Sequence, residues 1–166
     1  MYSRPLVPRL FRVPDPVQGN GFHLRMLTVH DVVKDYAAVM ESEARLVSFM
    51  NPHGNWPRGL TIQENLIDLG WHQKEFQTRR SFAYTVVHPS ESAVLGCVYL
   101  LPTQKRGFDA EVYLWARQSA LASGLEDRLH ADVTDWVASS WPFTSVGFPG
   151  RSTSLAAWQA LENEPR

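Results

Sequence analysis

The chain has 166 residues, of which 44% are hydrophobic and 20% charged, and its formal net charge at pH 7 is −1. This length favours a single domain with a sizeable core, and the near-neutral charge argues against nucleic acid as a partner. The lone Cys97 excludes an intrachain disulfide. No apolar run approaches the roughly 18 residues of a membrane-spanning helix, and no signal-peptide core is visible. We therefore expect a cytoplasmic protein without a membrane partner.

The first 20 residues are predicted to form an extended, proline-rich arm. Proline disfavours both a helix and a central strand, and four prolines interrupt this segment: Pro5, Pro8, Pro14 and Pro16. The arm packs either against the body of the protein or against a neighbouring subunit, and the sequence does not choose between the two. Residues 21–166 are predicted to form one domain.

A strand and a helix are predicted directly after the arm. Residues 22–27 alternate like a short strand, and the spacing of Thr28 and Asp31 resembles a capping box at the start of a helix. Helical spacing follows at Val33, Tyr36, Ala37 and Met40. An irregular stretch, residues 48–60, follows, and turn-forming residues dominate it.

A second helix is predicted from a full capping box formed by Thr61 and Glu64. The helix should run to about residue 79 or 80, where arginines suit a helix C-terminus. Its predicted buried stripe is Ile62, Leu66, Leu69 and Phe76. A polar set on the same helix suggests a metal site, but a solvated polar face explains it better; the set is Glu64, Asp68, His72 and Glu75.

Three strands are predicted next, at residues 82–87, 94–101 and 109–116. Consecutive strands with short connections form an antiparallel meander. In the third strand, one side is purely apolar and the other carries charged and aromatic residues. This two-faced pattern predicts a core on one side of the strand and a cleft or solvent on the other.

Another long helix is predicted at residues 125–141, after a loop that ends in a Ser123–Glu126 capping box. Its buried face repeats at helical spacing: Leu125, Leu129, Val133, Trp136 and Val137. A short strand at 145–148 then lies parallel to the strand at 109–116, because the helix between them supplies the crossover. A final helix at 153–163 is expected to turn three residues inward, namely Leu155, Trp158 and Leu161.

One stretch carries a family resemblance, the strand Ala110-Glu111-Val112-Tyr113-Leu114-Trp115 with the loop and helix that follow it. It resembles the core of the GNAT superfamily of acyl-CoA N-acyltransferases, where this strand is often written A-E-I/V-x-x-W. The family's loop has Arg or Gln, then Gly, then Gly or Ala, and here those positions hold Ser119, Ala122 and Gly124. The resemblance covers about residues 22–161.

The resemblance implies an α/β (α+β) fold, with a mixed, mostly antiparallel sheet flanked by helices. GNAT domains usually continue with two more strands, and this chain ends before them. The exposed sheet edge is then covered by the arm or by a partner subunit, so a homodimer through the sheet edge or the arm is left open.

The resemblance also implies acetyl-CoA as cofactor, with its pantetheine arm between the two splayed parallel strands and its pyrophosphate on the loop. The positions that would contact it are Trp115, Arg117, Ser119, Ala122, Ser123, Gly124 and Leu125. Glu111 would be the general base. The resemblance implies a tyrosine near the last helix as proton donor, and the final helix lacks one. Tyrosines on the predicted strands remain, namely Tyr84, Tyr99 and Tyr113; Tyr113 is the second catalytic candidate, although packing explains each of them better. The acceptor pocket would involve His53, Asn55 and Trp56.

Each of these residues also has a purely structural explanation. Glu111 suits a salt-bridged sheet residue, Trp115 a half-buried core aromatic, and residues 53–56 a surface turn anchored by one tryptophan. Three functions therefore remain in view. The first is transfer of an acetyl group from acetyl-CoA to a small amine. The second is a non-catalytic GNAT-like ligand-binding module that has lost CoA. The third is an interaction subunit that pairs through its sheet edge. No metal is expected.

Overall fold

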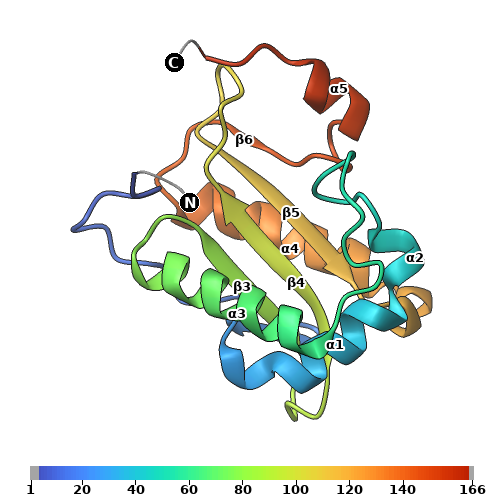
Figure 1. The fold of residues 1–166 in the computed structure, drawn as a ribbon. Helices are drawn as coiled ribbons and strands as arrows, with labels where there is room; N and C mark the ends of the chain where they lie inside the picture. The colour runs from blue at the N-terminus through green and yellow to red at the C-terminus, as the bar shows by residue number, and fades with distance from the viewer. Residues whose placement is uncertain (1–3, 165–166) are drawn as a thin grey trace.

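A six-stranded sheet in the order β1-β2-β3-β4-β5-β6 runs through the computed structural model, which describes residues 4–164 (Figure 1). The strands are β1 (Gln18–Gly19), β2 (Phe22–Met26), β3 (Phe82–Val87), β4 (Val94–Leu101), β5 (Ala110–Ala116) and β6 (Val146–Gly147). The helices are α1 (Val32–Glu41), α2 (Glu43–Leu46), α3 (Ile62–Gln77), α4 (Leu125–Ser140) and α5 (Leu155–Ala160), with 3-10 turns at Val29–Asp31 and Gln118–Ser123.

The sheet confirms the predicted meander and the predicted parallel strand. Neighbouring strands from β1 to β5 are antiparallel, and β5 and β6 are parallel. The parallel pairing is only two residues long, Ala110 with Val146 and Glu111 with Gly147. Beyond Glu111 the two strands part. The rest of β5 therefore presents an edge that β6 does not cover.

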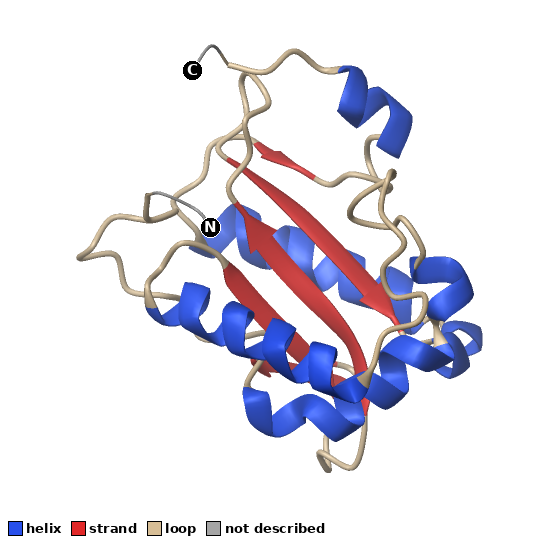
Figure 2. Ribbon diagram, in the orientation of Figure 1, coloured by secondary structure: helices blue, strands red, loops and turns tan. Residues whose placement is uncertain are grey.

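Helices cover both faces of the sheet, with α1 and α3 in front and α4 behind in Figure 2. Side chains alternate along β5, so Val112 and Leu114 join the core under α4, while Tyr113 and Trp115 join the core under α1 and α3. The predicted inner face of α4 is confirmed, because all of its members are buried: Leu125, Leu129, Val133, Trp136 and Val137.

The predicted buried stripe of α3 is wrong for two of its four members, while Leu69 is buried and Phe76 packs against the core. Val33 of α1 is 66% exposed, and Ile62 and Leu66 of α3 are 47% and 42% exposed. The faces that turn inward are partly polar, with Asp35 on α1 and Asn65 on α3. These two side chains satisfy each other, since the Asn65 amide donates to the Asp35 carboxylate at 2.9 Å. Mutual hydrogen bonding lets polar groups take positions that periodicity assigns to apolar ones.

The predicted solvated face of α3 is also wrong for two of its members. His72 and Glu75 are only 7% and 0% exposed. The Glu75 carboxylate pairs with Lys74 at 2.7 Å, and the His72 ring lies against Tyr99 with centroids 5.2 Å apart. The buried side of α3 is therefore a polar and aromatic surface beside β4.

The N-terminal arm contacts the body of the protein. The backbone N–H of Leu6 donates to the Arg79 carbonyl at 2.7 Å, and the Trp136 indole donates to the Asp15 carbonyl at 3.0 Å. The end of the arm forms β1, which the sequence analysis missed, and residues 1–3 of the arm lie outside the described residues. The division of the chain into an arm at residues 1–20 and a domain at residues 21–166 stays a prediction.

The final helix is shorter than predicted. It spans Leu155–Ala160 and buries Trp158 to 3% exposure, but Leu161 lies beyond it at 37% exposure, so its predicted inward position is wrong. The tail then pairs with the β4–β5 loop, where Glu164 donates to the Gln104 carbonyl at 2.8 Å. Within residues 4–164, every helix is too short or too polar to cross a bilayer.

Asp35 generates a prediction about pH. Burial raises the pKa of its carboxyl group to about 6, from an ordinary value of 3.8. The unfolded chain therefore ionises first, and the parent loses stability as the pH rises from about 4 to 7. Asp35→Asn cannot ionise, so its free energy of unfolding relative to the parent should improve by ~3 kcal/mol across that range. Urea denaturation at about pH 4 and pH 7 measures the free energy of unfolding of the parent and the variant. Asp135→Asn, at an exposed position, is the control. A stability difference between Asp35→Asn and the parent that is the same at both pH values would contradict the prediction.

Candidate functional site

The first candidate region is the β5–α4 loop, residues 117–124, at the open end of the gap between β5 and β6. The loop forms a 3-10 turn at Gln118–Ser123, and Gly124 then adopts a left-handed conformation with φ of 70°. Glycine accepts this backbone geometry without steric cost, which lets the chain turn directly into α4. All of the predicted cofactor positions except Trp115 and Leu125 lie in this loop, and those two flank it.

The predicted Ser123–Glu126 capping box is wrong. The N-cap of α4 is Gly124, and the Ser123 hydroxyl instead donates to the Ala120 carbonyl at 2.7 Å. The Glu126 carboxylate reaches back to the end of β5, where it accepts the Ala116 N–H at 2.9 Å. It also pairs with Arg45 at 3.1 Å and Arg151 at 2.7 Å. Two arginines and one backbone N–H therefore stabilise the Glu126 carboxylate in this position more than a single capping hydrogen bond would.

A second carboxylate, Glu41 at the end of α1, lies on the loop itself. It accepts the Ser119 N–H at 2.6 Å and forms an ion pair with Arg117. The Arg117 guanidinium and the Ser119 donors lower the pKa of Glu41 to about 2. Next to this contact, the Gln118 N–H donates to the Ser42 hydroxyl at 3.0 Å. Glu41 therefore stays ionised and bound to the loop at any physiological pH.

Glu126 is also held ionised, although it is more buried. Burial opposes its charge, but the bonds from Ala116, Arg151 and Arg45 outweigh burial and keep the pKa of Glu126 below its usual value. Arg151 makes a further contact, since its guanidinium donates to the Leu114 carbonyl at 3.3 Å. That carbonyl lies on the part of β5 that no longer pairs with β6.

The predicted catalytic residues lie further back on β5. Glu111 is half-buried, and one of its oxygens accepts from the Thr103 hydroxyl and from the Trp158 indole, each at 3.0 Å. Burial raises the pKa of Glu111, while these two bonds act in the opposite direction. Tyr113 is buried, and its ring meets Phe49 edge-on with centroids 5.7 Å apart.

Two other positions on this face are shaped by close packing. Trp115 is wholly buried in the core under α1 and α3, so its side chain is not at the surface of the loop. Trp158 of α5 packs directly on Gly147, where an added Cβ atom would lie 2.1 Å from the indole Cη2. Gly147 therefore allows the indole to reach Glu111.

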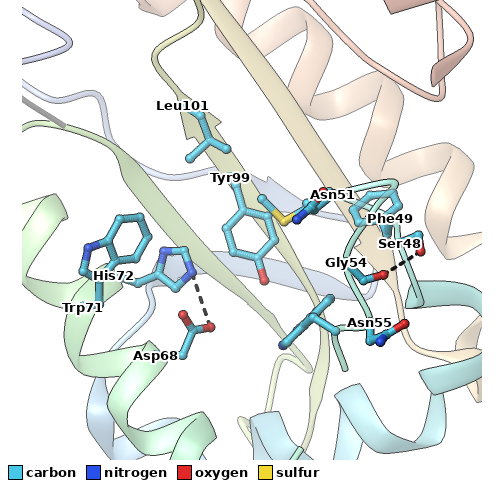
Figure 3. A pocket seen from close by; sticks show the side chains of 12 residues that line it. Ser48, Phe49, Asn51, Gly54, Asn55, Asp68, Trp71, His72, Tyr99 and Leu101 are labelled. Carbon is cyan, nitrogen blue, oxygen red and sulfur yellow. Dashed lines mark hydrogen bonds and ion pairs between the residues drawn. The ribbon is translucent and has the colours of Figure 1, made fainter. Parts of the chain in front are cut away.

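The second candidate region is a cavity of about 370 Å³, here called the aromatic pocket. Its walls come from the loop at residues 48–56, from Asp68, Trp71 and His72 of α3, and from Tyr99 and Leu101 of β4. Figure 3 shows Tyr99 between the α3 side chains and those of the loop. Aromatic rings are contributed by all three elements.

Two of the three predicted acceptor residues line the aromatic pocket, Asn55 and Trp56, whereas His53 is not among its lining residues. The contribution of α3 to the aromatic pocket was not predicted, because the polar face of that helix was interpreted as solvated. The available signal was the i, i+4 spacing of Asp68 and His72, which places both side chains on one helix face.

The charge of the aromatic pocket is negative. The Asp68 carboxylate lies 3.7 Å from the His72 imidazole, and no lysine or arginine is among the lining residues. Burial lowers the pKa of His72, against the opposing effect of Asp68 and Glu75, so the ring is neutral at pH 7. Among residues 4–164, no group of three or more His, Cys, Asp or Glu side chains is arranged to hold a metal ion.

Comparison with known proteins gives structural matches alone. No protein-family model and no curated protein matches the sequence. The ribosomal-protein-S5-alanine acetyltransferase from Vibrio fischeri matches with a TM-score of 0.60 and 15% identity, over 75% of this chain and 67% of that one. A GNAT-family acetyltransferase from Bacillus anthracis matches with a TM-score of 0.59 and 10% identity, over 87% and 81%. RimL, the ribosomal L7/L12 alpha-N-protein acetyltransferase, in complex with coenzyme A, matches at 0.58 and 16%, over 74% and 68%. Identities this low show a shared fold.

The β5–α4 loop does not fit a pyrophosphate as it is arranged. The N–H groups of Ala116 and Ser119 already donate to the two carboxylates, and that of Gln118 donates to a hydroxyl. Three nearby arginines, Arg45, Arg117 and Arg151, are paired with the same two carboxylates, whereas Arg128 donates to the Ser123 carbonyl. Two of the positions that the resemblance assigns to the cofactor, Arg117 and Ser119, are therefore engaged by Glu41 within the chain.

The contact between Trp158 and Glu111 generates a prediction. In Trp158→Phe the ring still covers Gly147, but the carboxylate loses an indole donor, so the pKa of Glu111 should rise further. A carboxyl ¹³C NMR titration measures it. Trp136→Phe, which removes an indole donor under the opposite face of the sheet, is the matched control. An unchanged pKa in Trp158→Phe would show that the indole does not stabilise the charge.

Proposed function

We propose that this chain, which has the fold of the GNAT acetyltransferases, binds a small amine-bearing organic cation in its aromatic pocket. The observation that carries the proposal is the composition of the pocket walls. Aromatic rings surround the cavity, Asp68 is the acidic residue among the lining residues, and none of them is lysine or arginine. A protonated amine at neutral pH has the matching charge.

Physical chemistry supports this choice of ligand. The face of an aromatic ring attracts a cation, with a gain of about 0.5 to 2 kcal/mol depending on how far the site excludes water. Phe49, Trp56 and Tyr99 come from the loop and from β4, so rings are available on more than one side of a bound group. Asp68 adds a Coulombic attraction, which its 45% exposed side chain keeps modest.

The size of the pocket supports a small ligand. A cavity of about 370 Å³ lies within the range of small-molecule sites. The pocket also resembles such sites in its chemistry, because apolar and aromatic walls dominate and a few polar groups such as Asn51 and Asn55 interrupt them. These amides provide hydrogen bonds that would select among cations of similar size.

Benzylamine and benzyl alcohol test the proposal at pH 7.5, because they differ mainly in charge. We expect isothermal titration calorimetry to show benzylamine binding at least ~10-fold tighter than the alcohol, a difference of 1.4 kcal/mol. Asp68→Asn should weaken benzylamine binding by roughly two- to fivefold. Asp135→Asn on α4 removes the same charge behind the sheet and should leave binding unchanged. Equal affinities for amine and alcohol, or no binding of either, would refute the proposal.

Acetylation of the bound amine is a second candidate function, and the position of Glu111 favours it. Glu111 pairs across the sheet with Leu101, which lines the aromatic pocket. A carboxylate whose pKa is raised accepts a proton better near neutral pH. The structural neighbours include acetyltransferases of ribosomal proteins, so the acceptor amine belongs either to a small molecule or to a protein.

Mass spectrometry of the parent with acetyl-CoA and benzylamine tests this second function. If acetylation occurs, N-benzylacetamide accumulates, and Glu111→Gln should form it ~100-fold more slowly because the amide cannot accept the proton. Thr103→Val is a suitable control, since it removes one hydrogen bond to Glu111 and keeps the carboxylate. A parent that forms no product excludes acetylation of this amine, and equal rates in Glu111→Gln exclude Glu111 as the base.

A further inference from the structure

The end of β5 presents a compact group of backbone donors, and the chain supplies anions to them. The N–H groups of Ala116 and Ser119 donate to Glu126 and Glu41 at 2.9 and 2.6 Å. The carboxylates come from different elements, Glu41 from α1 and Glu126 from α4. Two negative groups on neighbouring backbone donors are what a bound pyrophosphate would provide.

Three of the arginines around the loop are also bound to these two carboxylates. Arg117 pairs with Glu41, while Arg45 and Arg151 both pair with Glu126, at 3.1 and 2.7 Å. Glu126 is 14% exposed, so its charge is only weakly screened by solvent. Because Glu41 and Glu126 already pair with these arginines and accept from the backbone donors, an incoming polyanion would have to displace both carboxylates to reach the same groups.

The edge of β5 beyond the parallel pairing is also contacted from within the chain. Arg151 follows β6, and its guanidinium donates to the Leu114 carbonyl at 3.3 Å while it holds Glu126. Arg45 donates to the Ala116 carbonyl from the other side of the loop. The gap between the parted strands is therefore spanned by side chains that are bound to both the strand and the carboxylates.

We infer that Glu41 and Glu126 are internal substitutes for the pyrophosphate of an acyl-CoA, and that the chain with both carboxylates in place does not bind CoA. The carboxylates complete the fold by satisfying donors that the GNAT arrangement would otherwise direct at a cofactor. This inference concerns the β5–α4 loop and is independent of amine binding in the aromatic pocket. It excludes the acetylation given as a second candidate function, so the acetyl-CoA titration of the parent decides between the two.

The test compares two double variants. Each removes two negative charges, one from α4 and one from α1 or α2. Glu41→Ala with Glu126→Ala frees the Ala116 and Ser119 donors and the arginines. Glu43→Ala with Asp127→Ala is the control, because both residues lie in the first turn of their helices, α2 and α4, and make no contact with the loop donors. Isothermal titration calorimetry with acetyl-CoA and with inorganic pyrophosphate gives the readout.

We expect neither acetyl-CoA nor pyrophosphate to bind the parent or the control variant at millimolar concentration. Both probes should bind the Glu41→Ala, Glu126→Ala protein, with an affinity at least ~10-fold above the limit set by the control. Acetyl-CoA binding to the parent would overturn the inference. So would a folded double variant, with a parent-like circular dichroism spectrum, that gains no more affinity than the control. If the double variant does not fold, Glu41→Ala alone replaces it, because the Glu41 side chain is 29% exposed. This single variant should also bind pyrophosphate at least ~10-fold more tightly than the control.

The calorimetric results for the two sites separate cleanly. Benzylamine titrations report on the aromatic pocket and pyrophosphate titrations report on the loop. Failure of the amine proposal leaves the loop result standing, and acetyl-CoA binding to the parent leaves the amine result standing.

Discussion

The parting of β5 and β6 after two residue pairs is the constraint on which the rest of the site depends. A backbone group that loses its strand partner must find another partner or water, because an unpaired buried donor or acceptor is costly. On the free part of β5, the Leu114 carbonyl accepts from Arg151, and Ala116 bonds to Glu126. By resemblance to GNAT enzymes, a pantetheine arm would lie in this gap, and here side chains of the chain satisfy the edge.

The two candidate regions are connected through one continuous segment. Glu41 and Arg45, near the ends of α1 and α2, hold the β5–α4 loop and Glu126. The residues that follow, 48–56, form one wall of the aromatic pocket. The ion pairs that occupy the loop therefore also anchor the start of the pocket wall. A small pocket with a fixed wall favours binding of a preformed shape.

The polar interior under α1 and α3 is the cost of this arrangement. Asp35 and Glu75 are nearly or wholly buried, and burial of a carboxylate is unfavourable unless hydrogen bonds or cations compensate it. Asn65 compensates Asp35, and Lys74 compensates Glu75. Asp68 and His72, on the same side of α3, reach the aromatic pocket. The departure of α3 from a simple apolar stripe thus coincides with its role as a pocket wall, as expected where function competes with stability.

The sequence by itself determined the order of the elements apart from the short β1 and α2, together with the meander, the crossover to β6 and the inner face of α4. These features follow from local periodicity and turn chemistry, so no distant residue has to be known. Only the tertiary structure decided that Glu126 leaves its helix cap for Arg45, 81 positions away, and that Glu41 binds Ser119, 78 positions away. It also decided that His72 and Tyr99 share a pocket. Such contacts depend on how helices are placed against the sheet, and the spacing of residues within one helix does not encode that placement.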